Sequence, residues 1–190
     1  MDPFSEFRLW YSMWLNTNPE EPAAMALSTA GRDGHVSSRI VLLRDYDEKG
    51  FVFFTNYTST KGTQIHENPH AALLFYWPAL SKQVRIEGMI EKTSREQSEK
   101  YFHARARENQ LGAWASQQST RIPDREYLLQ RFDHFVDKFA DREVDVPPHW
   151  GGYRLTPTWF EFWTAGRHRL NDRVSYRLSG AKWIREILAP

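Results

Sequence analysis

The chain has no cysteine. This absence excludes disulfide bonds, thiolate catalysis, iron–sulfur clusters and cysteine-ligated zinc. A surplus of one charge is also missing, because 25 basic residues balance 24 acidic ones for a formal net charge of +1. Such a balance argues against a dedicated binder of nucleic acid or of anionic membranes. The composition therefore predicts neither a nucleic acid nor a membrane as a partner.

Long apolar runs are lacking as well. No uncharged apolar stretch approaches the roughly 18 residues that would span a membrane. The start, Met1-Asp2-Pro3-Phe4, has neither the basic nor the apolar region of a signal peptide. We therefore expect a cytoplasmic protein. With 190 residues, 41% of them hydrophobic and 15% aromatic, the chain suits a single domain, residues 1–190, around one core.

Apolar periodicity and capping residues predict four helices. Asp2 and Pro3 suit an N-cap and a first helical position, and Ser94 with Gln97 forms a capping box. The first helix carries an aromatic stripe: Phe4, Phe7, Tyr11, Trp14 and Leu15. The others are expected over 60–67, from 94 to about 106, and from Asp124, the last with Leu128, Leu129, Phe132, Phe135 and Phe139 on one face.

Between the helices the apolar period changes to two, which is typical of strands. The expected strands are Met25–Thr29, Val36–Leu43, Phe51–Thr55, Ala71–Trp77, Gln83–Glu91, Gly152–Leu155, Trp159–Thr164, Val174–Leu178 and Trp183–Leu188. Turn-length connections between consecutive strands imply antiparallel hairpins. The sequence therefore predicts an α+β fold, a mainly antiparallel barrel with inserted and flanking helices.

The chain contains one sequence pattern that is typical of metal sites. His66-Glu67-Asn68-Pro69-His70 fits the zinc pattern H-E-x-x-H, which needs both histidines on one face of a continuous helix. Pro69 should end that helix before His70, so we predict no metal site here. No nucleophile elbow, P-loop or G-x-G-x-x-G fingerprint occurs either, which points away from hydrolases and Rossmann dehydrogenases.

Several polar clusters suit an anionic ligand. Tyr101, Arg105 and Asn109 are spaced by four and would share a helical face that can hold a phosphate. Thr55, Ser59, Thr60 and Lys61 form a second cluster at a strand-to-helix junction, where free backbone N–H groups favour an anion. This second cluster could equally be a simple helix cap.

Two strands carry further candidates. Arg39 and Arg44 bound an apolar strand, and strict alternation puts them on opposite faces unless the strand bends. Near the C-terminus, an extended segment would place Arg169, Asn171 and Arg173 on one face, suited to a planar anionic heterocycle. Solvated strand ends and a charged edge strand are the alternatives.

In this order the motifs resemble the pyridoxine/pyridoxamine 5′-phosphate oxidase family over essentially the whole chain. The resemblance rests on Asp2-Pro3-Phe4, Arg39–Arg44, Phe53-Phe54-Thr55-Asn56, Ser59-Thr60-Lys61, Gln83–Gly88, Tyr101-Phe102, Gly112–Ser116, Trp150–Tyr153, Glu161-Phe162-Trp163, Arg169–Arg173 and Leu188-Ala189-Pro190. It implies an FMN-binding split barrel that forms a homodimer, with each active site shared between the two chains.

The resemblance also implies roles for individual residues. FMN would be held by Arg39, Ile40, Val41, Leu42, Phe54, Thr55, Thr60, Lys61, Gln83, Gln118, Ser119, Trp163 and Arg173. A phosphorylated pyridine substrate would be held by Arg44, Tyr101, Arg105, Asn109, Arg169 and Asn171, the last two acting in catalysis. The main departure is Asn171, because the family usually has histidine there. Asparagine can form hydrogen bonds but cannot titrate.

The activity so implied is oxidation of pyridoxamine or pyridoxine 5′-phosphate to pyridoxal 5′-phosphate. A hydride passes from the substrate to FMN, and O₂ reoxidises the flavin to give H₂O₂. Two alternatives remain at this stage. One is an oxidase of the same fold that acts on another ring system, as in phenazine pathways. The other is a carrier of FMN or pyridoxal phosphate without enzymatic activity.

Overall fold

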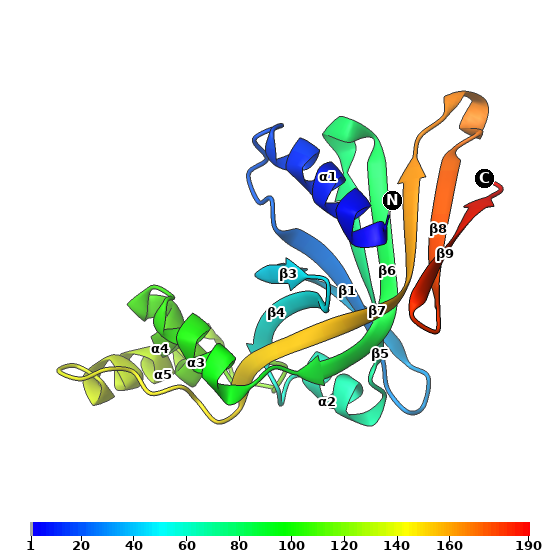
Figure 1. Ribbon diagram of the computed structural model, residues 1–190. Helices are drawn as coiled ribbons and strands as arrows, with labels where there is room; N and C mark the ends of the chain where they lie inside the picture. The colour runs from blue at the N-terminus through cyan, green and yellow to red at the C-terminus, as the bar shows by residue number, and fades with distance from the viewer. Residues whose placement is uncertain (1) are drawn as a thin grey trace.

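A computed structural model describes residues 2–190, which form a curled antiparallel sheet with helices at both ends (Figure 1). The helices are α1 (Pro3–Leu15), α2 (Thr60–Glu67), α3 (Arg95–His103), α4 (Arg107–Ala115) and α5 (Arg125–Lys138). The strands are β1 (Ala24–Ala30), β2 (Val36–Leu42), β3 (Asp45–Asp47), β4 (Gly50–Asn56), β5 (His70–Trp77), β6 (Lys82–Lys92), β7 (Trp150–Thr164), β8 (Asp172–Ser179) and β9 (Lys182–Leu188). The predicted α+β split barrel is confirmed.

The sheet runs β2-β1-β5-β6-β7-β4-β3, and β8 and β9 extend it from β7. The sequence predicted two strands where the structure has the single 15-residue β7. Pro157 lies within this strand, where the β6–β7 register shifts next to Gly88. A bulge accommodates a residue that lacks an N–H donor. A Cβ at Gly88 would lie 2.1 Å from the Thr156 carbonyl oxygen, so the close approach needs glycine.

Helix α1 closes one end of the barrel (Figure 1). The Asp2 side chain caps it by accepting hydrogen bonds from the Phe4 and Ser5 N–H groups at 3.0 and 3.1 Å. Phe4 and Phe7 are buried among the aromatic residues of the main core, whereas Leu15, at the last position, is 44% exposed. The predicted helix and most of its apolar stripe are confirmed.

Helices α3, α4 and α5 form a lobe beside the barrel, with their own core around Phe102, Leu111 and Phe139. The sequence predicted one helix from 94 to about 106, but α3 ends at His103 and α4, which was not predicted, starts at Arg107. Leu129 was expected on the buried face of α5 and is 46% exposed. Phe135 is buried and Phe132 packs against the same core, so the predicted apolar face of α5 is covered only in part.

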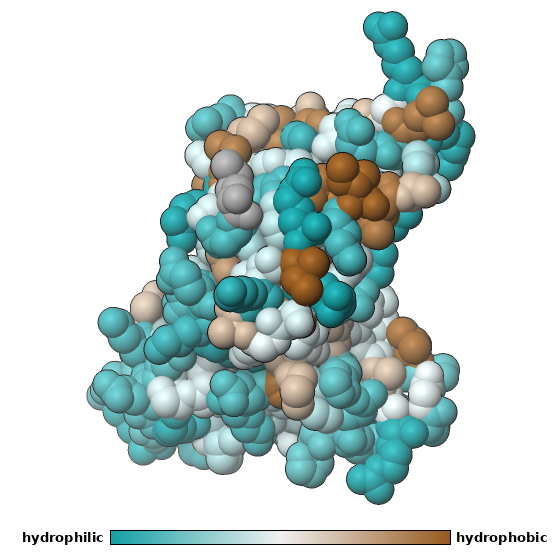
Figure 2. Space-filling view, turned by 45° about the vertical axis from the view of Figure 1, so that its right-hand side comes forward, coloured by the Kyte–Doolittle hydropathy of each residue, from teal (hydrophilic) through white to brown (hydrophobic). Residues whose placement is uncertain are grey.

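The face of the molecule in Figure 2 is mainly hydrophilic, with apolar side chains gathered mostly on the barrel, away from the helical lobe. Between residues 2 and 190, none of the helices combines the length and the apolar character required to cross a membrane.

Candidate functional site

A cavity of about 470 Å³ lies between the barrel and the helical lobe. It is lined by Arg39, Ile40, Val41, Leu42, Arg44, Phe54, Thr55, Lys61, Tyr101, Arg105, Gln118, Ser119 and Trp150. We call it the cationic pocket, because four of these residues are basic and none of the described lining residues is acidic. Four cations without a carboxylate in one cavity favour an anionic ligand.

One corner of the pocket holds Arg39 and Lys61. The Lys61 Nζ donates to Thr55 Oγ1, Ser59 Oγ and Gln118 Oε1 at 3.2, 3.3 and 3.1 Å, all neutral acceptors. Burial, and then the nearby positive charge of Arg39, lower the pKa of Lys61. Burial also lowers the pKa of Arg39. Burial thus disfavours the charged forms of both side chains, and a bound anion would offset this desolvation cost.

A second corner of the pocket is built on stacked aromatic rings. Phe54 stacks on Tyr101 with centroids 4.0 Å apart and on Trp150 at 5.5 Å. Arg105 lies 5.0 Å over the Trp150 ring, and Arg44 lies 5.9 Å from the Tyr101 centroid. The buried Arg105 Nη1 has no hydrogen-bond partner among residues 2–190. A buried donor without a partner is costly, so it marks a place for an acceptor on a ligand.

Burial lowers the pKa of Arg105, Tyr101 raises it, and the charge of Arg44 lowers it further. The corner therefore gathers two guanidiniums and a phenol without a counterion among the described lining residues. This is the donor set expected for a second phosphate group.

The local chain path explains how these residues meet. Alternation predicted opposite faces for Arg39 and Arg44, but β2 ends at Leu42, so Arg44 leaves the strand and reaches the same pocket. Tyr101 and Arg105 were expected to share a helical face with Asn109, which is wrong. Arg105 follows the end of α3, whereas Asn109 is exposed on α4 and is not among the lining residues.

Three other predicted cofactor residues, Gln83, Trp163 and Arg173, lie elsewhere on the sheet. The register pairs Gln83 with Trp163 across β6 and β7, and Trp163 with Arg173 across β7 and β8. We call these three residues the sheet row. Arg173 donates to Glu161 Oε2 at 2.7 Å and to the Ala189 carbonyl oxygen at 2.8 Å. The hydrogen bond to Glu161 raises the pKa of Arg173.

The segment between β7 and β8 differs from the prediction. Arg169, Asn171 and Arg173 were expected in one extended segment, but Arg167–Arg169 form a 3₁₀ turn and β8 starts only at Asp172. Asn171 Oδ1 accepts a hydrogen bond from the Gly166 N–H at 3.1 Å and closes the turn. Arg169 has a φ of 63°, so its backbone is left-handed rather than extended. The turn, not a strand, positions both side chains.

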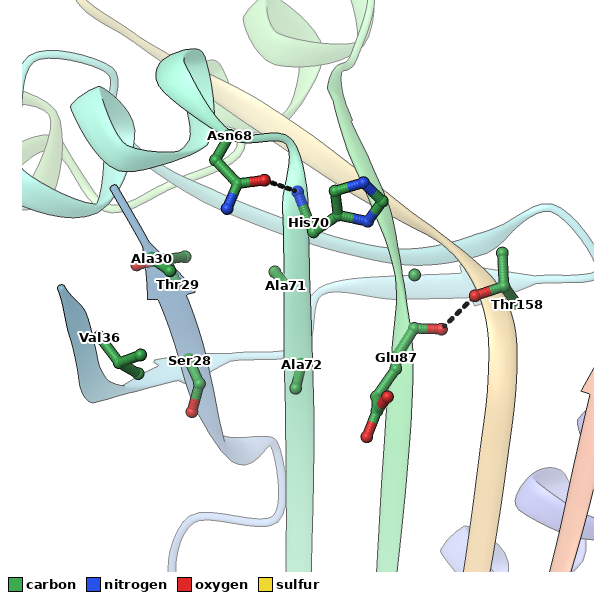
Figure 3. Close-up of a pocket in the computed structure, with 11 residues that line it drawn as sticks. Ser28, Thr29, Ala30, Val36, Asn68, His70, Ala71, Ala72, Glu87 and Thr158 are labelled. Atoms are coloured by element: carbon green, nitrogen blue, oxygen red, sulfur yellow. Dashed lines mark hydrogen bonds between the residues drawn. The ribbon is translucent and has the colours of Figure 1, made fainter. Parts of the chain in front are cut away.

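A second hollow, of about 320 Å³, lies on the sheet beside β1, β5 and β6 (Figure 3). Its lining includes the small residues Ser28, Ala72 and Gly88 together with the carboxylate of Glu87. Asn68 Oδ1 accepts a hydrogen bond of 3.3 Å from the backbone N–H of His70, which is drawn as a dashed line in Figure 3. With a carboxylate and no lysine or arginine among the described lining residues, this hollow is less suited to a phosphate than the cationic pocket.

Two pocket features were not assigned from the sequence. Trp150 forms part of the aromatic wall, and only the prolines before it hinted that a new element starts there. The Thr60 side chain is not among the lining groups, but its backbone N–H donates to Ser119 Oγ at 3.2 Å. The pocket lining thus does not support the cofactor contact predicted for Thr60, whose backbone instead binds Ser119, a residue that does line the pocket.

The fold and the site define a class: a split-barrel protein whose cationic pocket suits a ligand, or a pair of ligands, with two separate anionic groups. Residues 15–138 match the family described as pyridoxamine 5′-phosphate oxidase. Residues 150–190 match the pyridoxine 5′-phosphate oxidase C-terminal dimerisation region. The chain belongs to the pyridoxamine 5′-phosphate oxidase family and is therefore an oxidoreductase. The resemblance noted from the sequence is confirmed.

Curated relatives span the whole chain. A protein of Gloeothece citriformis named pyridoxine/pyridoxamine 5′-phosphate oxidase is 50% identical over 190 residues, covering 100% of this chain and 89% of that protein. A protein of the same name from Pseudomonas paraeruginosa is also 50% identical, over 191 residues, with the same coverage of 100% and 89%.

Two solved structures resemble the fold. PhzG from Burkholderia lata, in complex with tetrahydrophenazine-1-carboxylic acid, has a TM-score of 0.94 and 31% identity, covering 100% of this chain and 93% of that one. A pyridoxamine 5′-phosphate oxidase-related, FMN binding protein from Nostoc punctiforme has a TM-score of 0.78, with coverage of 100% and 98%. At 16% identity, the second structure supports the fold alone.

Proposed function

We propose that this protein oxidises pyridoxamine or pyridoxine 5′-phosphate to pyridoxal 5′-phosphate, using FMN as cofactor and O₂ as acceptor, with H₂O₂ as product. The observation that carries the proposal is the pairing of two cationic corners in one pocket, Arg39 with Lys61 and Arg44 with Arg105. Two corners suit two phosphate groups, one on the cofactor and one on the substrate. The names of the relatives agree with this substrate class.

The pocket residues fit FMN on grounds of chemistry. Arg39 and Lys61 supply cations for its phosphate, and Thr55 and Ser119 add hydroxyl groups beside them. Ile40, Val41 and Leu42 line the pocket and would supply an apolar surface beside the flat ring. When bound, FMN supplies the hydride acceptor that no side chain can provide.

The second corner would hold the substrate phosphate. Arg105 Nη1 would donate to a phosphate oxygen, and the charge of Arg44 would add to the attraction. Fixing the phosphate at one end holds the carbon to be oxidised at a set distance, which converts binding energy into orientation. The assignment of Asn109 to this phosphate, made from the sequence, finds no support in its exposed position on α4.

The site would be completed by a second copy of the chain. Gln83, Trp163 and Arg173 belong to the sheet row and are not among the residues that line the cationic pocket. We propose a homodimer in which the sheet row of each copy, with Arg169 and Asn171 from the adjacent turn, faces the pocket of the other. The match of residues 150–190 to a dimerisation region supports this arrangement. The single-domain organisation and the cytoplasmic location stay predictions.

The test is an oxidase assay on protein loaded with FMN. Pyridoxamine 5′-phosphate should bleach the flavin absorbance under nitrogen, and in air each turnover should yield one H₂O₂. Pyridoxamine without its phosphate should react far more slowly at low concentration, because it cannot use the second corner. Flavin that stays oxidised with both phosphorylated substrates would refute the proposed activity.

One observation favours the alternative of an oxidase that acts on a phenazine-type ring. The PhzG structure, which contains a phenazine precursor, matches the whole chain at a TM-score of 0.94. The presence of Arg44, Tyr101 and Arg105 in one corner favours the phosphorylated substrate, because a phosphate carries more negative charge and offers more acceptor oxygens than the single carboxylate of a phenazine precursor. Reduction of the flavin by a dihydrophenazine carboxylate, but not by pyridoxamine 5′-phosphate, would decide for the alternative.

A further inference from the structure

A buried glutamine lies next to the corner of the cationic pocket that holds Arg39 and Lys61. Gln64 on α2 is 7% exposed and lies outside the lining of the cationic pocket. Its Oε1 accepts hydrogen bonds from Thr29 Oγ1 and Ser37 Oγ at 2.6 and 2.8 Å. Its Nε2 donates to the His35 carbonyl oxygen at 3.1 Å. The amide orientation follows from chemistry, because the reverse orientation would set two carbonyl oxygens against each other.

The hydroxyl groups of Thr29 and Ser37 connect Gln64 to Arg39 through hydrogen bonds. A hydroxyl has one proton, and both Thr29 and Ser37 give theirs to Gln64. Their lone pairs are then left to accept from the guanidinium. Arg39 Nη1 donates to Thr29 Oγ1 at 2.7 Å and to the Leu27 carbonyl oxygen at 3.2 Å, and Nη2 donates to Ser37 Oγ.

The sheet register explains why these groups meet. Thr29 pairs with Ser37, and Leu27 with Arg39, so the side chains of Thr29, Ser37 and Arg39 lie on one face of β1 and β2. Thr29 on β1 is visible in Figure 3 beside the end of α2. Helix α2, which contacts β1, places Gln64 over this face. The same helix carries Lys61 at its N-terminal end, so one element fixes both cations of the corner.

The described contacts occupy three of the five N–H donors of Arg39. Nε and one hydrogen of Nη2 remain for a ligand. With its other face tied to two hydroxyls and a carbonyl, the guanidinium cannot turn without breaking these bonds. A cation held in one orientation loses less conformational entropy when it binds a phosphate.

We propose that Gln64 is a positioning residue for the cofactor phosphate: through Thr29 and Ser37 it holds Arg39 in the orientation that binds FMN. This proposal rests on the proposed function, because it takes Arg39 as a phosphate ligand. It predicts an effect specific to the phosphate, which a general structural role would not produce. Riboflavin, which is FMN without phosphate, is therefore the matched ligand.

The experiment compares FMN and riboflavin dissociation constants, measured by flavin fluorescence, for the wild type, Gln64→Met, Arg39→Ala and the double variant. Gln64→Met keeps the side-chain length but removes all three hydrogen bonds. We expect it to weaken FMN binding about tenfold and to leave riboflavin binding unchanged. In the Arg39→Ala background it should have no further effect on FMN, because its action passes through Arg39.

Thr63→Ala, one residue away on the exposed side of α2, is the control and should bind FMN like the wild type. Should Gln64→Met fail to fold, Ser37→Ala and Thr29→Val each remove one arm and should each weaken FMN about threefold, again without affecting riboflavin. The positioning role is overturned if Arg39→Ala loses the preference for FMN over riboflavin while these variants keep it. It is also overturned if the Gln64 effect persists undiminished in Arg39→Ala.

A wild-type preference for FMN that survives in Arg39→Ala would have a wider consequence. It would remove Arg39 from the phosphate site, and so contradict the proposed function as well as the role of Gln64.

Discussion

The cationic pocket and the sheet row differ in whether their basic side chains have a carboxylate partner. In the pocket, Lys61 and Arg105 have no carboxylate among the described lining residues, and burial lowers the pKa of both. In the row, Arg173 pairs with the buried carboxylate of Glu161, which raises its pKa. Arg85 adds a second contact to Glu161 at 3.5 Å. The pocket therefore depends on a ligand for its counter-charge, whereas the row is compensated within the chain.

This difference indicates which part of a ligand each region would meet. Uncompensated cations gain most from phosphate groups. A compensated arginine beside Trp163 and Gln83 presents a flat, fixed surface with little net charge, which suits the edge of a ring. We propose that the two regions are complementary halves of one site and that a second copy of the chain brings them together, because the residues of the sheet row do not line the cationic pocket of their own chain.

The largest expected effect comes from mixing the halves. Lys61→Met in the pocket and Arg173→Met in the row should each abolish nearly all activity. When the two inactive proteins exchange subunits, about one quarter of all sites should be intact, because half the dimers are mixed and each mixed dimer has one native site. Mixing Lys61→Met with Arg39→Ala should restore nothing, because both changes lie in the same half. Equal results from the two mixtures would contradict a shared site.

Lys61 should also make FMN binding depend on pH. A bound phosphate favours the charged lysine, so FMN affinity is highest below the pKa of Lys61 in the free protein and falls as the pH rises through it. Since that pKa is lowered, the fall should come below 10.5. Lys61→Met should bind FMN roughly ten- to hundredfold more weakly and lose this pH dependence. Titrations of FMN and riboflavin between pH 7 and 10.5 check this; a pH dependence shared by riboflavin would count against it.

Substitutions in the two regions should also differ in their effect on the free energy of unfolding. Glu161→Gln leaves two guanidiniums with less compensation and should lower the free energy of unfolding of the flavin-free protein by about 1–3 kcal/mol. Lys61→Met removes a desolvated charge and should leave that stability equal or higher. Glu186→Gln, an exposed carboxylate on the adjacent β9, is the control for the loss of charge. Urea denaturation measures all three, and a larger loss in Lys61→Met than in Glu161→Gln would reverse the comparison.

The smallest effect is expected at Asn171. Asn171→Ala removes the acceptor for the Gly166 N–H and should cost about 1 kcal/mol of stability, whereas Asn171→Asp keeps the acceptor and should cost less. Asn171→His should leave FMN affinity unchanged and give turnover a new dependence between about pH 5 and 8. Thermal unfolding and pH–rate profiles provide the measurements. An unchanged profile in Asn171→His would mean that this side chain does not reach the substrate.

The class of the protein and most of its helices and strands can be inferred from the amino-acid sequence alone. Capping residues and proline set the limits of α1 and α2, because these signals act within a few residues of the helix end. Pro69 was enough to reject the apparent zinc motif, and His70 does begin a strand. Gln83, Arg85 and Glu87 lie on one face of β6, as the alternation of side chains along a strand requires. Local rules worked at these positions because a single element decided each outcome.

The grouping of the candidate residues, in contrast, depends on the packing of distant segments. The end of β2 at Leu42 brings Arg44 to Arg39, and the break after His103 turns Arg105 into the pocket while leaving Asn109 outside. A turn closed by Gly166 and Asn171 occupies the place where an extended segment was expected. This turn needs glycine at position 166, because a Cβ there would lie 1.8 Å from the Leu170 carbonyl oxygen. Gln64 carried no signal in the sequence at all. Its significance depends on the register of two strands and on a helix laid across them, and contacts between distant segments follow from packing, which no local pattern specifies.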